Sequence, residues 1–383
     1  SASAPARAGR ALCFALGGLN RGEVRLVRRV DHGIGARGGD HAHDHVGRRE
    51  VLITQTVLAH RSLVVSSLSV LAVGLAACGG SSSVSSLNAA GASFPAKVYQ
   101  SWFAELAGSG GIKVNYQAVG SGSGRKAFID GTVDFAASDD PIKEADRKQV
   151  SQGVVQIPMV GGTIAFGYNK PGCELQLTQQ QAVEVATGAI SDWKELGCEA
   201  GTITWVHRSD GSGTTKAFTN SLQTFSPDWT LGSGKSVKWP VGVGAKGNSG
   251  VAGVIDNRVG AIGYVNQSYI KGNVQAAALQ NKSGEFLTPS VEAGAKALNG
   301  IELDQYLAGS NPNPSAAGAY PIATLTWVLA YAEGNGAKAE AVRKVFNYML
   351  EDSTQEGAAA LGFVPLRGSI LEKSRSAVAG IQP

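Results

Sequence analysis

The chain has 383 residues, of which 43% are hydrophobic and 17% charged, as expected for a globular protein of two or three domains. Its net charge of +4 comes from residues 1–77, which hold ten arginines and five acidic residues, whereas residues 78–383 hold 24 basic and 25 acidic residues. This near-neutral body gives no reason to propose nucleic-acid binding. No uninterrupted apolar run reaches the roughly 18 residues of a membrane-spanning helix.

Residues 1–77 are predicted to be an upstream extension that the native protein lacks, followed by a signal peptide. Within the extension, Gly39–His45 (GDHAHDH) has histidines and aspartates at alternate positions, which can chelate zinc. No helix or strand pattern surrounds this stretch, so we interpret it as biased composition and expect no metal site. No cofactor is expected elsewhere in the chain.

A short apolar run, Leu63–Ala77, follows Arg61 and is typical of the apolar region of a secretory signal. It ends in Leu-Ala-Ala-Cys, and glycines and serines come next, which resembles a bacterial lipobox. We therefore expect lipidation at Cys78 and a flexible tether over residues 78–87. The alternatives are a plain secretory signal and a buried helix with an incidental cysteine.

Two cysteines remain once Cys13 in the extension and Cys78 in the lipobox are set aside, namely Cys173 and Cys198. In the oxidising environment outside the membrane, two remaining cysteines predict a disulfide. It would close a loop of about 25 residues and stabilise the fold by about 3 kcal/mol on the chain-entropy model. The alternative is a metal bound by the two thiolates.

The residues after the tether alternate between helix-like and strand-like patterns. Helices are expected over residues 93–106, 120–129, 178–188, 215–223 and 339–351, and strands over residues 113–119, 132–138, 163–169, 202–208, 260–265 and 323–331. In the first helix Ser93 is placed to cap the N-terminus, and Pro95 is tolerated in the first turn. The alternation predicts an α/β fold.

Polar residues gather where these patterns predict strand ends and helix starts. The residues that follow strand-like runs are Ser121, Asp139 and Arg208, and those that open helices are Ser93, Ser123 and Ser212–Thr214. In open α/β sheets a ligand binds beyond the carboxyl ends of the strands, and helix N-termini offer free N–H groups to anions. Together with one guanidinium and one carboxylate, these turns predict a site for a small tetrahedral anion.

These stretches resemble one known family, the periplasmic phosphate-binding proteins of phosphate ABC importers. The matching stretches are NAAGASFPAKVYQSW, VNYQAVGSGSGRKAF, GTVDFAASDDPI, HRSDGSGTT, VKWPVGVGAKGNSGVAG and GAIGYV, in the family's order within residues 88–330. The resemblance implies a two-lobed, type II periplasmic-binding-protein fold, with lobe one over 88–168 and 322–383 and lobe two over 169–321. It also implies a lipid-anchored monomer outside the cytoplasmic membrane, which binds phosphate with high affinity and delivers it to the permease and ATPase subunits of the importer.

The resemblance further implies a role for each matching residue at the phosphate site. The expected phosphate-binding residues are Ser93, Phe94, Ser121, Asp139, Arg208, Asp210, Ser212, Gly213 and Thr214. The Ser93 hydroxyl and the Phe94 backbone N–H would donate to the anion, and Arg208 would pair with it while Asp210 steadies the guanidinium. The turn GSGSG stands where relatives often have Gly-Ser-Ser-Gly-Gly, so the position of Ser123 stays open.

Asp139 is expected to select the ligand. At neutral pH phosphate carries a proton and sulfate does not, so a buried carboxylate accepts a hydrogen bond from phosphate but meets only lone pairs on sulfate. An unpaired buried charge costs several kcal/mol, and a site built for one specific hydrogen rejects an analogue that lacks it. Arsenate is protonated like phosphate and stays an alternative ligand, ahead of sulfate and molybdate.

Two other classes of function receive less support. A phosphatase-like hydrolase would need a base or a metal beside a nucleophile such as Ser212 or Ser123. The one histidine after residue 60, His207, neighbours Arg208 on a strand and is expected to face the opposite side. A nucleotide-binding loop is suggested by Gly242–Gly247 (GVGAKG), but no acidic residue and helix follow it as that fingerprint requires. We therefore expect a binding protein without catalytic residues.

Overall fold

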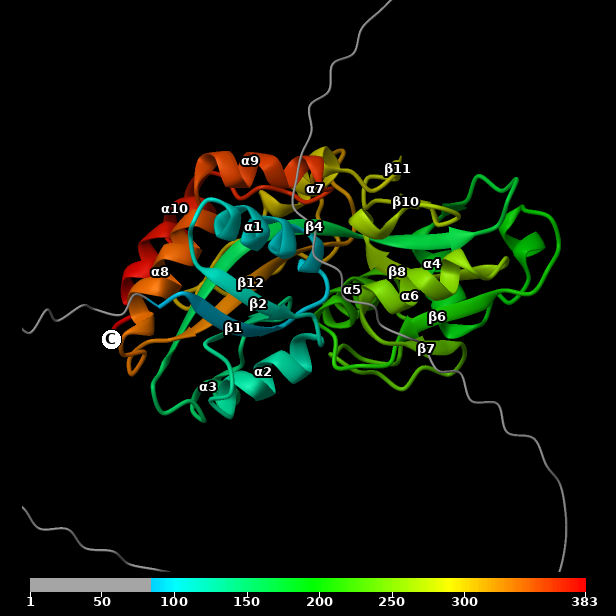
Figure 1. The fold of residues 1–383 in the computed structure, drawn as a ribbon. Coiled ribbons are helices and arrows are strands. Elements are labelled where there is room, and N and C mark those ends of the chain that lie inside the picture. The colour runs from blue at the N-terminus through cyan, green and yellow to red at the C-terminus, as the bar shows by residue number, and fades with distance from the viewer. Residues whose placement is uncertain (1–83) are drawn as a thin grey trace, which may run out of the picture. The chain divides into compact units, whose positions relative to one another are not determined.

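A mixed sheet of nine strands runs through residues 84–383, the part of the chain that this computed structural model describes (Figure 1). Its strands follow the order β2, β1, β3, β12, β4, β8, β6 and β7, with β9 paired to β4. Their bounds are β1 Ser86–Gly91, β2 Lys113–Gln117, β3 Phe135–Ser138, β4 Val154–Asn169, β6 Thr204–Arg208, β7 Val243–Ala245, β8 Ala261–Asn266, β9 Gln275–Ala276 and β12 Ala323–Tyr331. A three-stranded sheet contains β5 Gln176–Leu177, β10 Ala278–Gln280 and β11 Phe286–Leu287.

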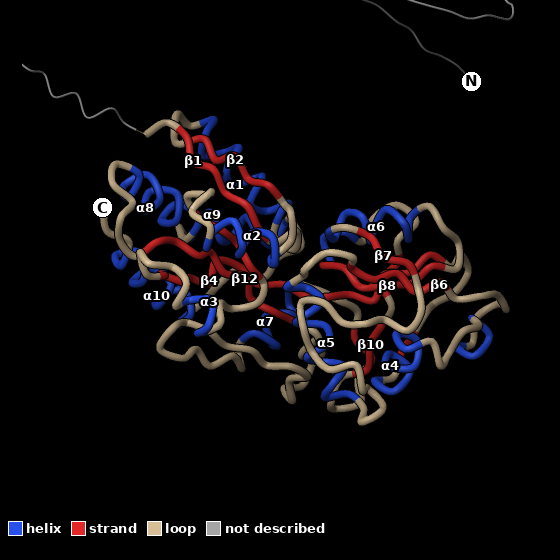
Figure 2. Tube along the Cα trace, turned by 90° about the horizontal axis from the view of Figure 1, so that it is seen from below, coloured by secondary structure: helices blue, strands red, loops and turns tan. Residues whose placement is uncertain are grey.

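Helices cover both faces of the large sheet. Their bounds are α1 Ala96–Gly108, α2 Ser121–Ile129, α3 Glu144–Arg147, α4 Gln179–Thr187, α5 Gly213–Phe225, α6 Gly247–Asp256, α7 Val291–Leu298, α8 Lys338–Met349, α9 Asp352–Ala360 and α10 Gly368–Ala377. In Figure 2, α6 lies on one side of β8 and β6, and α4 and α5 lie on the other. Within residues 84–383 no helix is long and apolar enough to cross a membrane.

The long strand β4 joins the two lobes of the fold. Residues 154–163 of β4 pair antiparallel with β12, and residues 164–169 pair antiparallel with β8. The first lobe holds β1, β2, β3 and β12, and the second holds β6, β7 and β8. From residue 156 onward β4 is buried throughout, as expected of a strand covered on both faces. The predicted two-lobed α/β fold is confirmed.

The start of the folded body differs in two places from the sequence prediction. β1 begins at Ser86, so the last two residues of the expected tether belong to the sheet. Helix α1 begins at Ala96 with Pro95 as its N-cap residue and without a side-chain cap. The expected cap, Ser93, instead accepts hydrogen bonds from Asn248. The predicted extension, the stretch Gly39–His45 and Cys78 lie outside the described residues.

Helix α7 packs on the first lobe, although the expected second lobe, residues 169–321, contains it. Its Gly294 leaves no room for a side chain beside Val364, and its Leu298 packs against Gly161 of β4. Gly161 lies in the part of β4 that pairs with β12. The chain therefore returns to the first lobe before α7, because the apolar face of this helix is buried there.

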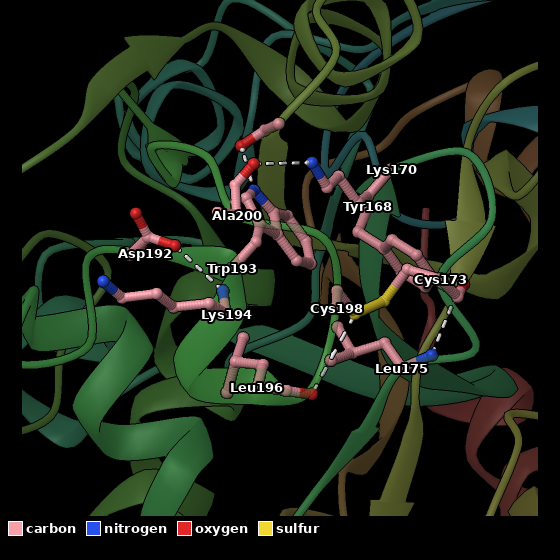
Figure 3. The surroundings of a disulfide bond; sticks show 11 residues. Tyr168, Lys170, Cys173, Leu175, Asp192, Trp193, Lys194, Leu196, Cys198 and Ala200 are labelled. Atoms are coloured by element: carbon pink, nitrogen blue, oxygen red, sulfur yellow. Dashed lines mark hydrogen bonds between the residues drawn. A yellow bond between two sulfur atoms is a disulfide. The ribbon is translucent and has the colours of Figure 1, made fainter.

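A disulfide joins Cys173 to Cys198 in the second lobe, with the two Cα atoms 5.4 Å apart and a sequence separation of 25 (Figure 3). The loop that it closes is tied to the sheet by aromatic residues. The Tyr168 hydroxyl donates to the Cys173 carbonyl at 2.7 Å, and the Trp193 indole N–H donates to the Gly260 carbonyl at 3.1 Å. Both aromatic rings are buried.

We predict that replacing both cysteines, as Cys173→Ala with Cys198→Ala, lowers the free energy of unfolding by about 3 kcal/mol, because the unfolded chain gains the freedom of the opened loop. Anion affinity should stay unchanged, since within residues 84–383 the polar residues expected to bind the anion form their side-chain hydrogen bonds outside this loop. Denaturant unfolding under reducing and non-reducing conditions measures the effect. Equal stability of the variant and the oxidised protein would contradict this prediction.

Candidate anion-binding site

Three helix starts meet where two strands end. Helix α2 begins at Ser121, α5 begins at Gly213, and α6 begins at Gly247. They lie beside the carboxyl ends of β3 and β6, as shown by hydrogen bonds from the Gly213 N–H to Ser121 Oγ and from the Asp139 N–H to the same atom. Helix N-termini bring unpaired N–H groups and a partial positive charge to this point.

Arg208, the last residue of β6, forms a two-pronged ion pair with Asp210. Its Nε donates to Oδ1 at 2.7 Å and its Nη2 donates to Oδ2 at 2.6 Å, with the two side chains 1% and 9% exposed. Asp210 also accepts the Gly247 N–H at 3.0 Å. Burial opposes ionisation of Asp210, but Arg208 and this N–H outweigh it and hold the pKa of Asp210 below its ordinary value. The guanidinium is thereby fixed in place.

The hydroxyls of Ser93 and Ser121 can act only as hydrogen-bond donors toward a ligand. A hydroxyl has two acceptor lone pairs and one donor hydrogen. Ser93 Oγ accepts from the backbone N–H and the side-chain Nδ2 of Asn248, at 2.9 and 3.1 Å. Ser121 Oγ accepts from the N–H groups of Asp139 and Gly213, at 3.2 and 3.1 Å. Both oxygens have used their lone pairs, so each O–H is free to donate.

Asp139 supplies a buried acceptor among these donors. Its Oδ2 accepts from Thr214 Oγ1 at 3.3 Å, while its Oδ1 is buried without a hydrogen-bond partner among residues 84–383. Burial raises the pKa of Asp139 to about 7, and the nearby Thr326 hydroxyl, the Arg208 charge and the Thr214 hydroxyl offset this only in part. An orphaned carboxylate oxygen is costly to bury and indicates a group that a ligand completes.

Glycine is required at two positions in the turns because the backbones approach so closely. A Cβ at Gly213 would lie 2.6 Å from Ser121 Oγ and 2.7 Å from Asp139 Cβ. Gly120 has φ near 94°, which is strained for other residues, and a Cβ there would lie 2.1 Å from Asp210 Oδ2. The glycines of both turns thus allow the two lobes to meet around the site.

The hydrogen-bond network brings together most of the residues predicted from the sequence. It includes Ser93, Ser121, Asp139, Arg208, Asp210, Gly213 and Thr214. Ser212 is buried and uses its Oγ to cap α5 through the Thr215 N–H at 3.0 Å. The ring of Phe94 packs edge-on against Phe363. Ser123 is exposed and takes no part in the network.

His207 lies beside Trp239, with the two rings stacked at 5.3 Å. Within the described residues its one hydrogen-bond contact is from Nδ1 to the Arg208 carbonyl, at 3.1 Å. None of the serine hydroxyls of the site has this imidazole as a partner.

Sequence reasoning missed three residues that shape the site. Asn248 contacts both Ser93 and Thr214. Arg125 is buried and holds the turn after Asp139, donating to the Asp140 carboxylate at 3.1 Å and to the Asp140 carbonyl at 2.6 Å. Thr326 is buried at a β-bulge where β12 and β4 lose register. Arg125 and Asn248 lie near helix starts in stretches that match the family, but no local pattern marks them as site residues, and Thr326 stands in no such stretch.

Comparisons with known proteins place the chain in a family. Residues 76–353 match the model of the PBP superfamily domain. The phosphate-binding protein PstS of Pasteurella multocida is 35% identical over 75% of this chain and 88% of its own length, and that of Haemophilus influenzae is 36% identical over 76% and 92%. The solved structure of a high affinity periplasmic phosphate-binding protein, PfluDING bound with phosphate, shares the fold, with a TM-score of 0.65 and 21% identity over 76% of this chain and 93% of that one. The chain belongs to the PBP superfamily and, within it, to the family of the phosphate-binding proteins PstS.

Proposed function

We propose that this protein binds inorganic phosphate outside the cytoplasmic membrane and delivers it to an ABC importer. Membership of the family named for phosphate binding supports the ligand, since relatives at 35 and 36% identity match over most of their length. The observation that carries the proposal is the buried, unpartnered Oδ1 of Asp139 within a shell of hydrogen-bond donors.

The donor and acceptor pattern of the site fits an anion that carries one proton. The Ser93 and Ser121 hydroxyls, the Arg208 guanidinium and the N–H groups at the helix starts are donors. Asp139 is the acceptor that faces them. Phosphate at neutral pH offers several acceptor oxygens and one hydrogen, so it satisfies both. Sulfate offers no hydrogen, so above the pKa of Asp139 it leaves the ionised carboxylate unpaired, which disfavours sulfate increasingly as the pH rises.

The same pattern argues against catalysis as the function. A nucleophilic serine needs a base that accepts its hydrogen. In this site the oxygens of Ser93 and Ser121 instead accept backbone and amide N–H groups, which draws on the lone pairs that would attack. The residues are therefore suited to hold an anion and to leave its bonds intact.

Delivery requires the two lobes to separate. Ser93, Ser121, Asp139, Arg208 and Thr214 are all buried, so an anion held between them has no direct route to water. Hinged separation of the lobes around β4 would open the site. In this proposal the protein acts as a monomer tethered through a lipid at Cys78, and it passes phosphate to the permease of an importer whose ATPase drives transport.

We predict tight one-to-one binding of phosphate and no heat with sulfate in calorimetric titrations at about pH 9, above the pKa of Asp139, where its carboxylate is ionised, after copurified phosphate is stripped. In Asp139→Asn the amide replaces a charged acceptor, so phosphate should bind about tenfold to a hundredfold more weakly, while sulfate should gain affinity because the amide N–H donates to it. Asp130→Asn, the same change at an exposed residue of the first lobe, is the control. Sulfate binding by the unmodified protein would contradict phosphate as the specific ligand. An unchanged preference for phosphate over sulfate in Asp139→Asn would contradict the proposed role of Asp139.

We also predict a pH dependence of stability from Asp139. Its pKa is 3.8 when exposed and about 7 in the folded protein, so the folded state holds a proton that the unfolded state loses between these values. Below about pH 4 this proton contributes its full stabilisation to the free energy of unfolding. That contribution, up to about 4 kcal/mol, is lost as the pH rises to 7. The ligand-free protein should therefore lose stability relative to Asp139→Asn across this range. Parallel unfolding free energies of the two proteins from pH 4 to 8 would contradict the buried, unpaired carboxylate.

A further inference from the structure

Asn248, the second residue of α6, contacts both lobes inside the site. It is fully buried. Its backbone N–H and Nδ2 donate to Ser93 Oγ of the first lobe, and Nδ2 also donates to Thr214 Oγ1 of the second lobe at 3.1 Å. These contacts join chain segments 155 and 34 residues apart.

The orientation of the Asn248 amide is fixed by a fourth hydrogen bond. Its Oδ1 accepts the backbone N–H of Asn266 at 2.8 Å, and a backbone N–H can only donate. The amide oxygen therefore faces β8, and the NH₂ group faces Ser93 and Thr214. Reversing the amide would place two donors against the Asn266 N–H and an oxygen where the serine and threonine oxygens now accept.

The amide sets the direction in which its neighbours donate. Among residues 84–383, Asn248 alone supplies both hydrogens that fill the lone pairs of Ser93 Oγ. Thr214 Oγ1 accepts from Asn248 and from Arg208 Nη1, at 3.1 and 3.3 Å, and so directs its own hydrogen at Asp139 Oδ2. Without the NH₂ group, the Ser93 hydroxyl would be free to turn and Thr214 would lose one donor.

We propose that Asn248 is a positioning residue: within the second lobe it directs the Thr214 hydroxyl, and when the lobes close it makes the Ser93 hydroxyl a donor, so that closure itself completes the donor shell. This inference rests on the proposed phosphate-binding function. When the lobes are apart, Ser93 loses its contact with α6 and its hydroxyl rotates freely. When they meet, the contact with Asn248 leaves Ser93 one hydrogen, which points to the ligand.

The test replaces the amide nitrogen by oxygen in Asn248→Asp, which keeps the shape. At pH 8 the introduced carboxylate cannot donate and repels the anion, so phosphate should bind about a hundredfold or more weakly relative to wild type. The ratio of variant to wild-type dissociation constants should fall as the pH drops and the carboxyl gains a proton that it can donate. Asn248→Ala should bind about tenfold more weakly at every pH. In both variants the loss should lie mainly in faster dissociation, because the contact forms on closure.

Ser249→Ala changes the neighbouring, exposed residue of α6 and should leave binding unchanged. Unfolding curves verify that each variant is folded. If Asn248→Asp does not fold, the dissociation rate of phosphate from Asn248→Ala tests the inference instead. A pH-independent ratio in Asn248→Asp, or wild-type dissociation rates in Asn248→Ala, would overturn the inference while phosphate binding by the wild type stands. Absence of phosphate binding by the wild type would instead overturn the proposed function together with this inference.

Discussion

An unpaired carboxylate oxygen buried between two lobes is expensive, and the architecture of this site follows from holding one there. Asp139 stays in position because Ser121 accepts its backbone N–H and because Arg125 clamps the following residue, Asp140. The neighbouring strand places Thr326 beside it at a β-bulge, and the next residue, Trp327, pairs with Pro158, which has no N–H to contribute to the ladder. Each of these contacts fixes a group that would otherwise rearrange to form hydrogen bonds with water.

The proposed anion site has no excess of positive charge. The Arg208 guanidinium is neutralised by Asp210, through two short hydrogen bonds. Binding must therefore come mainly from oriented N–H and O–H dipoles at the helix starts, which cost little to rearrange because the fold has already aligned them. Such a site discriminates by the number and direction of hydrogens on the ligand, since overall charge differs little between phosphate and sulfate.

Much of this arrangement could be predicted from the sequence, because it depends on local patterns. Strand-like runs that end in Asp139 and Arg208, and glycine turns that open helices, mark the edge of an α/β sheet. The α/β class followed from these patterns, and the two-lobed arrangement followed from the family resemblance. The cap assigned to Ser93 was wrong because a distant residue competes for its hydroxyl, and a local rule does not contain that contact.

The residues that orient the site could not be predicted, for the same physical reason. Asn248 meets Ser93 across 155 residues of sequence, and Thr326 meets the Asp139 turn across nearly 190. Only the folded structure brings such segments together, and the periodicity of a single sequence does not predict these contacts. The lipid anchor at Cys78 and the role of each phosphate-binding residue stay predictions.

The central claim is that one hydrogen on the ligand, accepted by Asp139, decides what this protein binds. Monofluorophosphate tests it most directly, because at neutral pH it matches hydrogen phosphate in shape and charge but has fluorine in place of the hydroxyl. Calorimetric titration at about pH 9, where Asp139 is ionised, should give a dissociation constant about a hundredfold weaker than for phosphate. Comparable affinity for the two anions would contradict the account, since the Asp139 carboxylate would then have no hydrogen to accept.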